Sequence, residues 1–128
     1  MENNYMGFES IYVYTRKQAI EDGVLVDISQ MAKEAGFKYP TAITSTAWHK
    51  YVVPDGPMQG CGQSIEGRLW DVLVCLNFSV KKGDSSTVLF MVNFLMEAQR
   101  TETVQLKAIC GPGDNAEPVI TIMMPNED

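Results

Sequence analysis

One histidine stands beside a tryptophan in this 128-residue chain, at Trp48-His49, and it is the residue best suited to proton transfer. Histidine is the side chain whose ordinary pKa lies nearest neutrality, which makes His49 a candidate general base. General-base catalysis also requires a partner group within hydrogen-bond reach, and the sequence places no recognisable nucleophile for His49. We therefore regard His49 as a weak catalytic candidate and Trp48-His49 as a candidate partner-binding pair.

Arg68 and Asp71 are three residues apart in the run GRLWD, which the hydrophobic pattern places on a helix. Residues at this spacing are neighbours on a helix surface, so the pair could form a partner-binding or weakly catalytic site. An ion pair on a narrow polar strip, shared with Ser64, or a tether from this strip to a loop explains the spacing without a ligand, and we favour this structural interpretation. The remaining large apolar residues of this helix are expected to form a second row of core contacts: Trp70, Val74 and Phe78.

Asp114 and Glu117 lie in the Gly/Pro-rich run GPGDNAE, where their carboxylates could bind a cation or a protein partner. Two carboxylates are too few for a calcium site, and their spacing does not match the EF-hand loop. The three cysteines and His49 also lack every common zinc-site spacing. The sequence therefore predicts a structural turn at Asp114 and Glu117, with no metal and no cofactor.

Cys61 lies between two glycines, where a thiol could be exposed and reactive. Activation needs a cation or a helix N-terminus that lowers the thiol pKa, and a helix is predicted to begin just afterwards, at Ser64. Because no base is placed beside Cys61, we interpret it as an ordinary loop cysteine. Cys75 and Cys110 fit the apolar pattern and are predicted to be core residues.

Charge and composition limit the function. The chain has 10 Lys and Arg and 16 Asp and Glu, a net charge of −6. Direct nucleic-acid binding is not expected, because it requires clustered cations. An acidic face could instead occupy the basic groove of a nucleic-acid-binding protein, although acidity also maintains solubility. With 45% hydrophobic residues, no secretory signal and no membrane span, the chain is expected to be one cytoplasmic domain, residues 1–128.

The first half of the chain predicts short helices separated by Gly and Pro. Thr15 and Gln18 form a capping box before the first helix, and Gly23 and Gly36 suit the left-handed positions after the first two. A long Gly/Pro-rich loop follows at Pro54 to Gln63. The expected elements are a helix at Arg16 to Asp22, a strand at Val24 to Val26, a helix at Ile28 to Ala35 capped by Asp27, and a helix that follows Ser45 or Thr46 and places Trp48, Tyr51 and Val52 on one side.

The second half predicts one long helix and then strands. The helix runs from Ser64 to about Phe78 and is expected to cross the sheet as the centre of the core. Thr87 to Glu97 shows little alternation, which is typical of a central strand covered on both faces. Thr103 to Cys110 alternates, and Val119 to Met124 is apolar enough for a strand covered on both faces. The expected fold is α+β, with short N-terminal helices and one long core helix packed on a C-terminal antiparallel sheet of three or more strands.

Five runs carry a family resemblance: YTRKQAIEDGVLVDISQMAKEAGF, Pro40 to Trp48, EGRLWDVL, LKAICGPGD and EPVITIMMPNED. In this order they resemble a family of short proteins of unknown function encoded by bacteria, phages and plasmids. The resemblance covers nearly the whole chain. It implies a cytosolic accessory protein carried on mobile DNA, and it provides no catalytic roles to transfer.

Three hypotheses of function follow. The first is a noncatalytic accessory protein that binds a host or phage protein, such as a nucleic-acid-binding nuclease of a host defence system, in the manner of an anti-CRISPR protein. Its candidate partner-binding residues are Trp48, His49, Arg68, Asp71, Asp114 and Glu117. The second is a small ribonuclease or toxin-like enzyme, which should expose His49, Arg68 or Arg100 in one cleft. The third is a small-ligand-binding regulator with a pocket between core helix and sheet.

Overall fold

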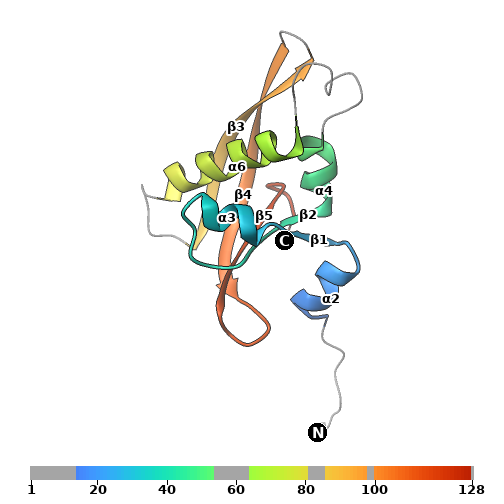
Figure 1. The fold of residues 1–128 in the computed structure, drawn as a ribbon, viewed down its shortest axis with the longest axis vertical. Helices are drawn as coiled ribbons and strands as arrows, with labels where there is room; N and C mark the ends of the chain where they lie inside the picture. Colours follow the sequence, from blue (N-terminus) through green and yellow to red (C-terminus); the bar gives the residue numbers. More distant parts are fainter. Residues whose placement is uncertain (1–13, 54–63, 81–85, 98–99, 128) are drawn as a thin grey trace, which may run out of the picture.

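The computed structural model describes residues 14–53, 64–80, 86–97 and 100–127. These residues form an α+β fold in which one long helix crosses a five-stranded mixed sheet (Figure 1). Short helices precede the long helix, and three of the strands follow it, as the sequence predicts. In chain order the elements are α2 (Arg16–Glu21), β1 (Leu25–Asp27), α3 (Ser29–Glu34), β2 (Thr41–Thr44), α4 (Ser45–Ala47), the π-helix η1 (Trp48–Val52), α6 (Ile65–Val80), β3 (Thr87–Glu97), β4 (Arg100–Pro112) and β5 (Pro118–Met123).

The strand order is β1-β2-β5-β4-β3. β3, β4 and β5 are antiparallel neighbours, which confirms the predicted C-terminal sheet. β2 extends this sheet by pairing with β5 in parallel, with Thr41 opposite Ile120, and β1 pairs antiparallel with β2. The sheet is therefore wider than expected, because two short strands from the first half of the chain complete it.

β3 has the predicted bounds, but its predicted central position is wrong. Among the described strands it pairs with β4 alone, and it forms one edge of the sheet. Its inner face contributes buried Phe90, Val92 and Phe94, whereas Leu89 and Met91 on the other face are 55% and 52% exposed. The central strand is β5, which is buried on both of its faces as predicted.

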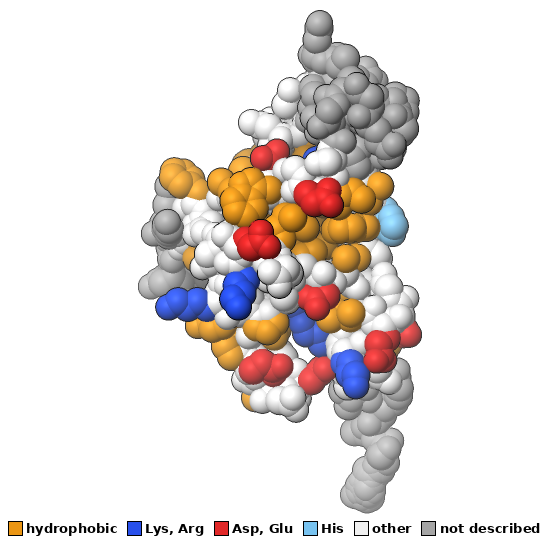
Figure 2. Space-filling view, in the orientation of Figure 1, with side chains coloured by type: hydrophobic (Ala, Val, Ile, Leu, Met, Phe, Trp, Pro, Cys, Tyr) orange, Lys and Arg blue, Asp and Glu red, His pale blue; other side chains and the backbone are white. Residues whose placement is uncertain are grey.

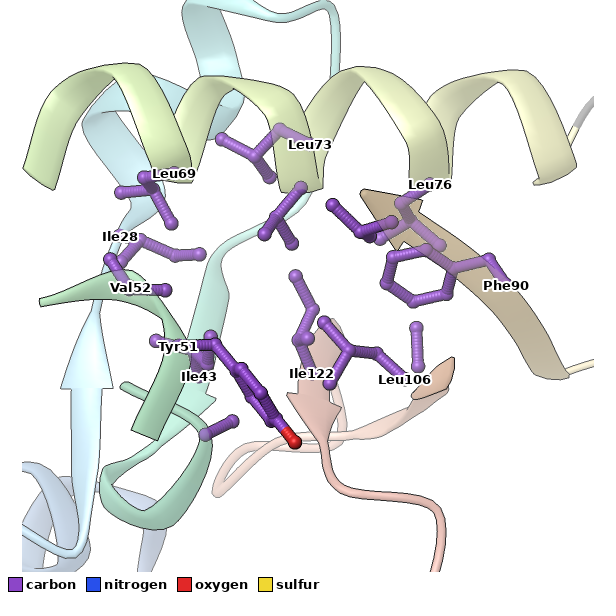
Figure 3. Close-up of a cluster of buried hydrophobic side chains, with 14 of the residues drawn as sticks. Ile28, Ile43, Tyr51, Val52, Leu69, Leu73, Leu76, Phe90, Leu106 and Ile122 are labelled. Atoms are coloured by element: carbon purple, nitrogen blue, oxygen red, sulfur yellow. The ribbon is translucent and has the colours of Figure 1, made fainter. Parts of the chain in front are cut away.

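The main core lies between α6 and the sheet. Leu69, Leu73 and Leu76 point from α6 toward buried side chains of the strands, including Leu106 and Ile122 (Figure 3). Burial of each such side chain stabilises the fold by about 1.5–3 kcal/mol. The helix was predicted to form the centre of the core, and this prediction is correct only for the side of α6 that faces the sheet.

The local signals for the first two helices are confirmed. Thr15 and Gln18 form the reciprocal capping box, and Gly23 and Gly36 have φ values of +80° and +103°, in the left-handed region. The predicted Asp27 cap is the exception. The Asp27 carboxylate accepts a hydrogen bond from the Ser29 backbone N–H at 3.0 Å, but α3 begins one residue later than predicted, and its N-cap is Ile28, which makes no side-chain capping hydrogen bond. Each of these signals depends on groups that are close in sequence.

The third helix differs from the prediction. Thr44, rather than Ser45 or Thr46, provides the cap, since its hydroxyl accepts a hydrogen bond from the Ala47 N–H at 3.3 Å. The chain then widens into η1, which buries Tyr51 and Val52 and leaves Trp48 half-buried. The predicted loop from Pro54 to Gln63, with Cys61, lies outside the described residues.

Cys75 is partly buried against the core, in keeping with the prediction, whereas Cys110 is exposed and the prediction for it is wrong. Cys110 lies near the end of β4, whereas Leu106 and Ala108, closer to the middle of the strand, are buried. Within the ranges that the structure describes, no helix has the length and apolar character needed to cross a membrane.

Candidate functional site

The side of α6 that faces away from the sheet carries large apolar side chains. Trp70, Val74 and Phe78 are 40%, 46% and 64% exposed, and their spacing of four residues aligns them along the helix. The prediction that they form a second row of the core is wrong, because α6 is covered by the sheet on one side only. We call these three residues the α6 ridge.

Arg68 lies on the buried side of the same helix and is only 3% exposed. Its Nη1 donates a hydrogen bond to the backbone carbonyl of Tyr51 at 2.5 Å. Its guanidinium carbon lies 5.6 Å from the centre of the Phe94 ring, and that ring stacks on Tyr51 with a centroid distance of 5.4 Å. The predicted exposed position of Arg68 is therefore wrong, and neither a substrate nor a partner can reach its guanidinium in this conformation.

Asp71 remains at the surface beside the α6 ridge. Partial burial raises the pKa of its carboxyl group, and burial followed by the charge of Asp71 raises the pKa of the Cys75 thiol. Glu66 lies one turn before Trp70 and is also exposed. Since Arg68 is buried, the exposed charges along α6 are both negative.

A shallow groove adjoins the N-terminal half of α6, between α6, α3 and η1. Its apolar lining includes Trp48, Met31 and Ile65, and it is bordered by the carboxylates of Asp27, Glu34 and Glu66, with no Lys or Arg among its described lining residues. On the face that α6 crosses, Figure 2 shows Asp and Glu side chains among hydrophobic ones, with Lys and Arg side chains nearby. We call this shallow groove the α6–α3 groove. Trp48, which the sequence proposed as a partner-binding residue, lies in this groove, and the sequence gave no indication that Met31 and Ile65 lie beside it.

Asp114 and Glu117 serve the turn between β4 and β5, as predicted. The Asp114 carboxylate accepts hydrogen bonds from the backbone N–H groups of Arg16 at 2.8 Å and Lys17 at 3.0 Å, and so it fastens the start of α2 to the hairpin. Glu117 accepts a hydrogen bond from the Asn115 N–H at 2.9 Å within the turn. These contacts make both carboxylates structural.

Arg16 completes the attachment of α2. Its guanidinium donates to the Thr121 hydroxyl at 2.6 Å and to the Ile120 carbonyl at 2.8 Å, across β5. Burial lowers the pKa of Arg16, and the charges of Asp27, Asp114 and Glu117 act in the opposite direction. The sequence did not single out Arg16, because its partners are about a hundred residues away.

The six predicted partner-binding residues do not form one site. The hairpin with Asp114 and Glu117 extends beyond the sheet at the end away from α6 (Figure 1). Trp48 and Asp71 belong to the surface around α6, His49 is exposed on η1, and Arg68 is buried. In the part of the chain that the structure describes, no three His, Cys, Asp or Glu side chains are grouped closely enough to hold a metal ion.

The sequence matches, over residues 1–128, the profile of a family of unknown function, DUF6573. The chain belongs to this family. No curated protein and no solved structure shows significant similarity to this DUF6573 chain. Its function must therefore be argued from its own surface, on which the α6 ridge and the α6–α3 groove are the most distinctive features.

Proposed function

We propose that this protein is a noncatalytic protein-binding protein that contacts its partner through the α6 ridge and the α6–α3 groove. The observation that carries the proposal is the outward position of Trp70 and Phe78 on a helix whose opposite side already fills the core. The partner surface that fits is an apolar cleft bordered by Lys and Arg.

The ridge has the form of a helix that enters a groove, with apolar anchors at i, i+4 and i+8. Aromatic residues supply a large share of binding energy at protein interfaces because they bury a large area with few rotatable bonds. Phe78 is 64% exposed, so most of the contribution of a fully buried Phe side chain, about 1.5–3 kcal/mol, remains to be gained on binding.

The charges around the ridge favour a basic partner. Glu66 and Asp71 accompany the ridge, and the neighbouring groove adds Asp27 and Glu34. Complementary charges steer association and exclude partners of the same sign. A second copy of this chain is therefore a poor occupant, because it would bring like charges together and each chain already has a net charge of −6.

A nucleic-acid-binding protein is a partner of the required sign, since its groove is rich in Lys and Arg. In its specific form, the proposal is that this protein comes from a phage or other mobile element and inhibits a nuclease of a host defence system, as an anti-CRISPR protein does. The acidic surface suits this role. The alternative of a small ribonuclease receives less support, because Arg68, one of its expected cleft residues, is buried against Tyr51 and Phe94.

Site-specific photo-crosslinking in cells of the encoding organism tests the proposal. A photoreactive phenylalanine analogue at Val74 should give one stoichiometric adduct with a basic protein, and the same analogue at Leu89, an equally exposed apolar position on β3, should not. Glu66→Lys together with Asp71→Lys should abolish that adduct while the variant remains folded. Adducts of equal yield from both positions, no adduct from Val74, or an adduct of twice 14.3 kDa that contains only this chain would each overturn it.

A further inference from the structure

A second pocket lies at the C-terminal end of α6, between this helix and the sheet. Its volume is about 280 Å³, and its wall combines Leu76 of α6 with Val88, Ile120 and Phe37 from β3, β5 and the segment after α3. The sulfur-bearing Cys110 of β4 also lines it and is exposed. This pocket shares no lining residue with the α6–α3 groove, and it is separate from the α6 ridge.

The described lining of the pocket is positively charged, whereas the protein as a whole is acidic. Lys38 is the one charged side chain of the described lining, and no carboxylate belongs to that lining. A lining with a lysine and no carboxylate is unusual in a chain with 16 acidic and 10 basic residues. A ligand that enters here meets an apolar wall and the exposed residue Lys38. An apolar site with a few polar groups that fix orientation is the usual form of a small-molecule site.

We propose that this pocket binds a small amphiphilic carboxylate, with its hydrocarbon part against Leu76, Val88 and Ile120 and its carboxylate beside Lys38. A neutral molecule of the same length would gain the apolar contacts alone, and an amine would in addition be repelled by Lys38. The volume lies just below the usual range of about 300–1,000 Å³ for ligand sites, so the ligand is small, with roughly six to eight carbon atoms.

The length of the hydrocarbon chain of the ligand should set its affinity. Each methylene group that leaves water contributes about 0.8 kcal/mol, which corresponds to about a fourfold tighter Kd. Butanoate, hexanoate and octanoate should therefore bind in increasing order until the chain fills the pocket. Attraction between the ligand carboxylate and the exposed ammonium group of Lys38 is of similar size or smaller, so loss of the Lys38 charge should weaken binding about twofold to fivefold.

Titration of the ¹⁵N-labelled full chain with these carboxylates, followed by NMR, tests the proposal. Shifts should concentrate at Val88, Ala108, Cys110 and Ile120, with hexanoate tighter than hexanol and hexanol tighter than hexylamine. Lys38→Gln should weaken hexanoate binding and leave hexanol binding unchanged, whereas Lys17→Gln, a control at a residue outside the pocket lining, should change neither. Hexylamine binding as tightly as hexanoate, or an unchanged hexanoate Kd in Lys38→Gln, would refute the assignment.

A second variant separates pocket binding from general surface adsorption. Cys110 is exposed at the pocket, so Cys110→Trp should preserve the fold and obstruct the ligand. Hexanoate should then produce no shifts at Val88 and Ile120 in an otherwise native spectrum. Retained hexanoate affinity in that variant, or shifts concentrated at Trp70 and Phe78 in the unmodified chain, would place the ligand elsewhere and overturn the proposal.

Discussion

Replacement of Arg68 by Met should destabilise the fold by about 2–3 kcal/mol. Met preserves much of the length of the aliphatic stem and removes the guanidinium. The variant then loses the hydrogen bond to the Tyr51 carbonyl and the contact with the Phe94 ring. A hydrogen bond from a charged donor contributes about 1.5–3 kcal/mol, and a desolvated cation over an aromatic ring contributes up to about 2 kcal/mol.

Part of this loss is recovered, because Met has no charge to desolvate, and the net effect therefore falls below the sum of the two contacts. Urea unfolding followed by circular dichroism measures it. With a denaturant slope of about 1–3 kcal/mol per molar for a small protein, the midpoint should fall by about 0.7–3 M. Asp71→Asn, an exposed change one turn away, is the matched control and should stay within about 0.5 kcal/mol of the unmodified chain.

The reasoning fails if Arg68→Met is as stable as the unmodified chain or more stable. That result would mean that desolvation of the guanidinium already cancels its contacts, as happens when some buried ion pairs are replaced by apolar side chains. Arg68→Lys refines the test. Lysine keeps the charge but lacks the planar group that lies over Phe94, so its stability should lie between those of Met and Arg.

Two further outcomes follow from the hairpin contact and the thiols. Asp114→Ala should lower the free energy of unfolding by about 1 kcal/mol, because the first two N–H groups of α2 lose their carboxylate acceptor. Amide hydrogen exchange at those two residues should accelerate, and unchanged exchange there would contradict the contact. In a Cys61→Ser background, a thiol reagent should label exposed Cys110 before Cys75, since burial and Asp71 raise the Cys75 pKa and so lower its thiolate fraction. Asp71→Asn should lower the Cys75 pKa and accelerate its labelling, and an equal or slower rate would show that the carboxylate exerts no such effect.

The sequence identified the apolar residues of α6 but could not show which row faces the sheet. Leu73 and Trp70 belong to two apolar rows, and a helix packed on one sheet buries only one side. Arg68 led to the wrong prediction for its own side of α6, because a cationic side chain normally lies on the exposed side of a helix. Its burial depends on the carbonyl of Tyr51, 17 residues earlier, and such a contact leaves no periodic pattern in the sequence.

The bounds of β3 could be predicted, whereas its place in the sheet could not. Both faces of its sequence are apolar, and apolar residues are common at protein surfaces, so Leu89 and Met91 do not reveal that one face lacks cover. Sheet order also depends on the pairing of Thr41 with Ile120, which are far apart in the chain. In contrast, the capping box of Thr15 was predicted correctly because all of its groups are local.

The same separation limited what the sequence could predict about the candidate site. Trp48 was selected by residue type, and it does line the α6–α3 groove. Its neighbours there come from α3 and α6, and their convergence is a property of the fold. Asp114 was correctly assigned to a turn, but its attachment to α2 joins residues 98 apart in the chain.

The central position of β5 constrains how the chain folds during synthesis. Until residues 118–123 leave the ribosome, the β1–β2 pair and the β3–β4 pair have no strand that joins them. Before that point the five-stranded sheet cannot form, and the apolar inner side of α6 lacks part of its cover. Formation of the native sheet therefore requires a contact between distant parts of the chain, and contacts of this kind slow folding.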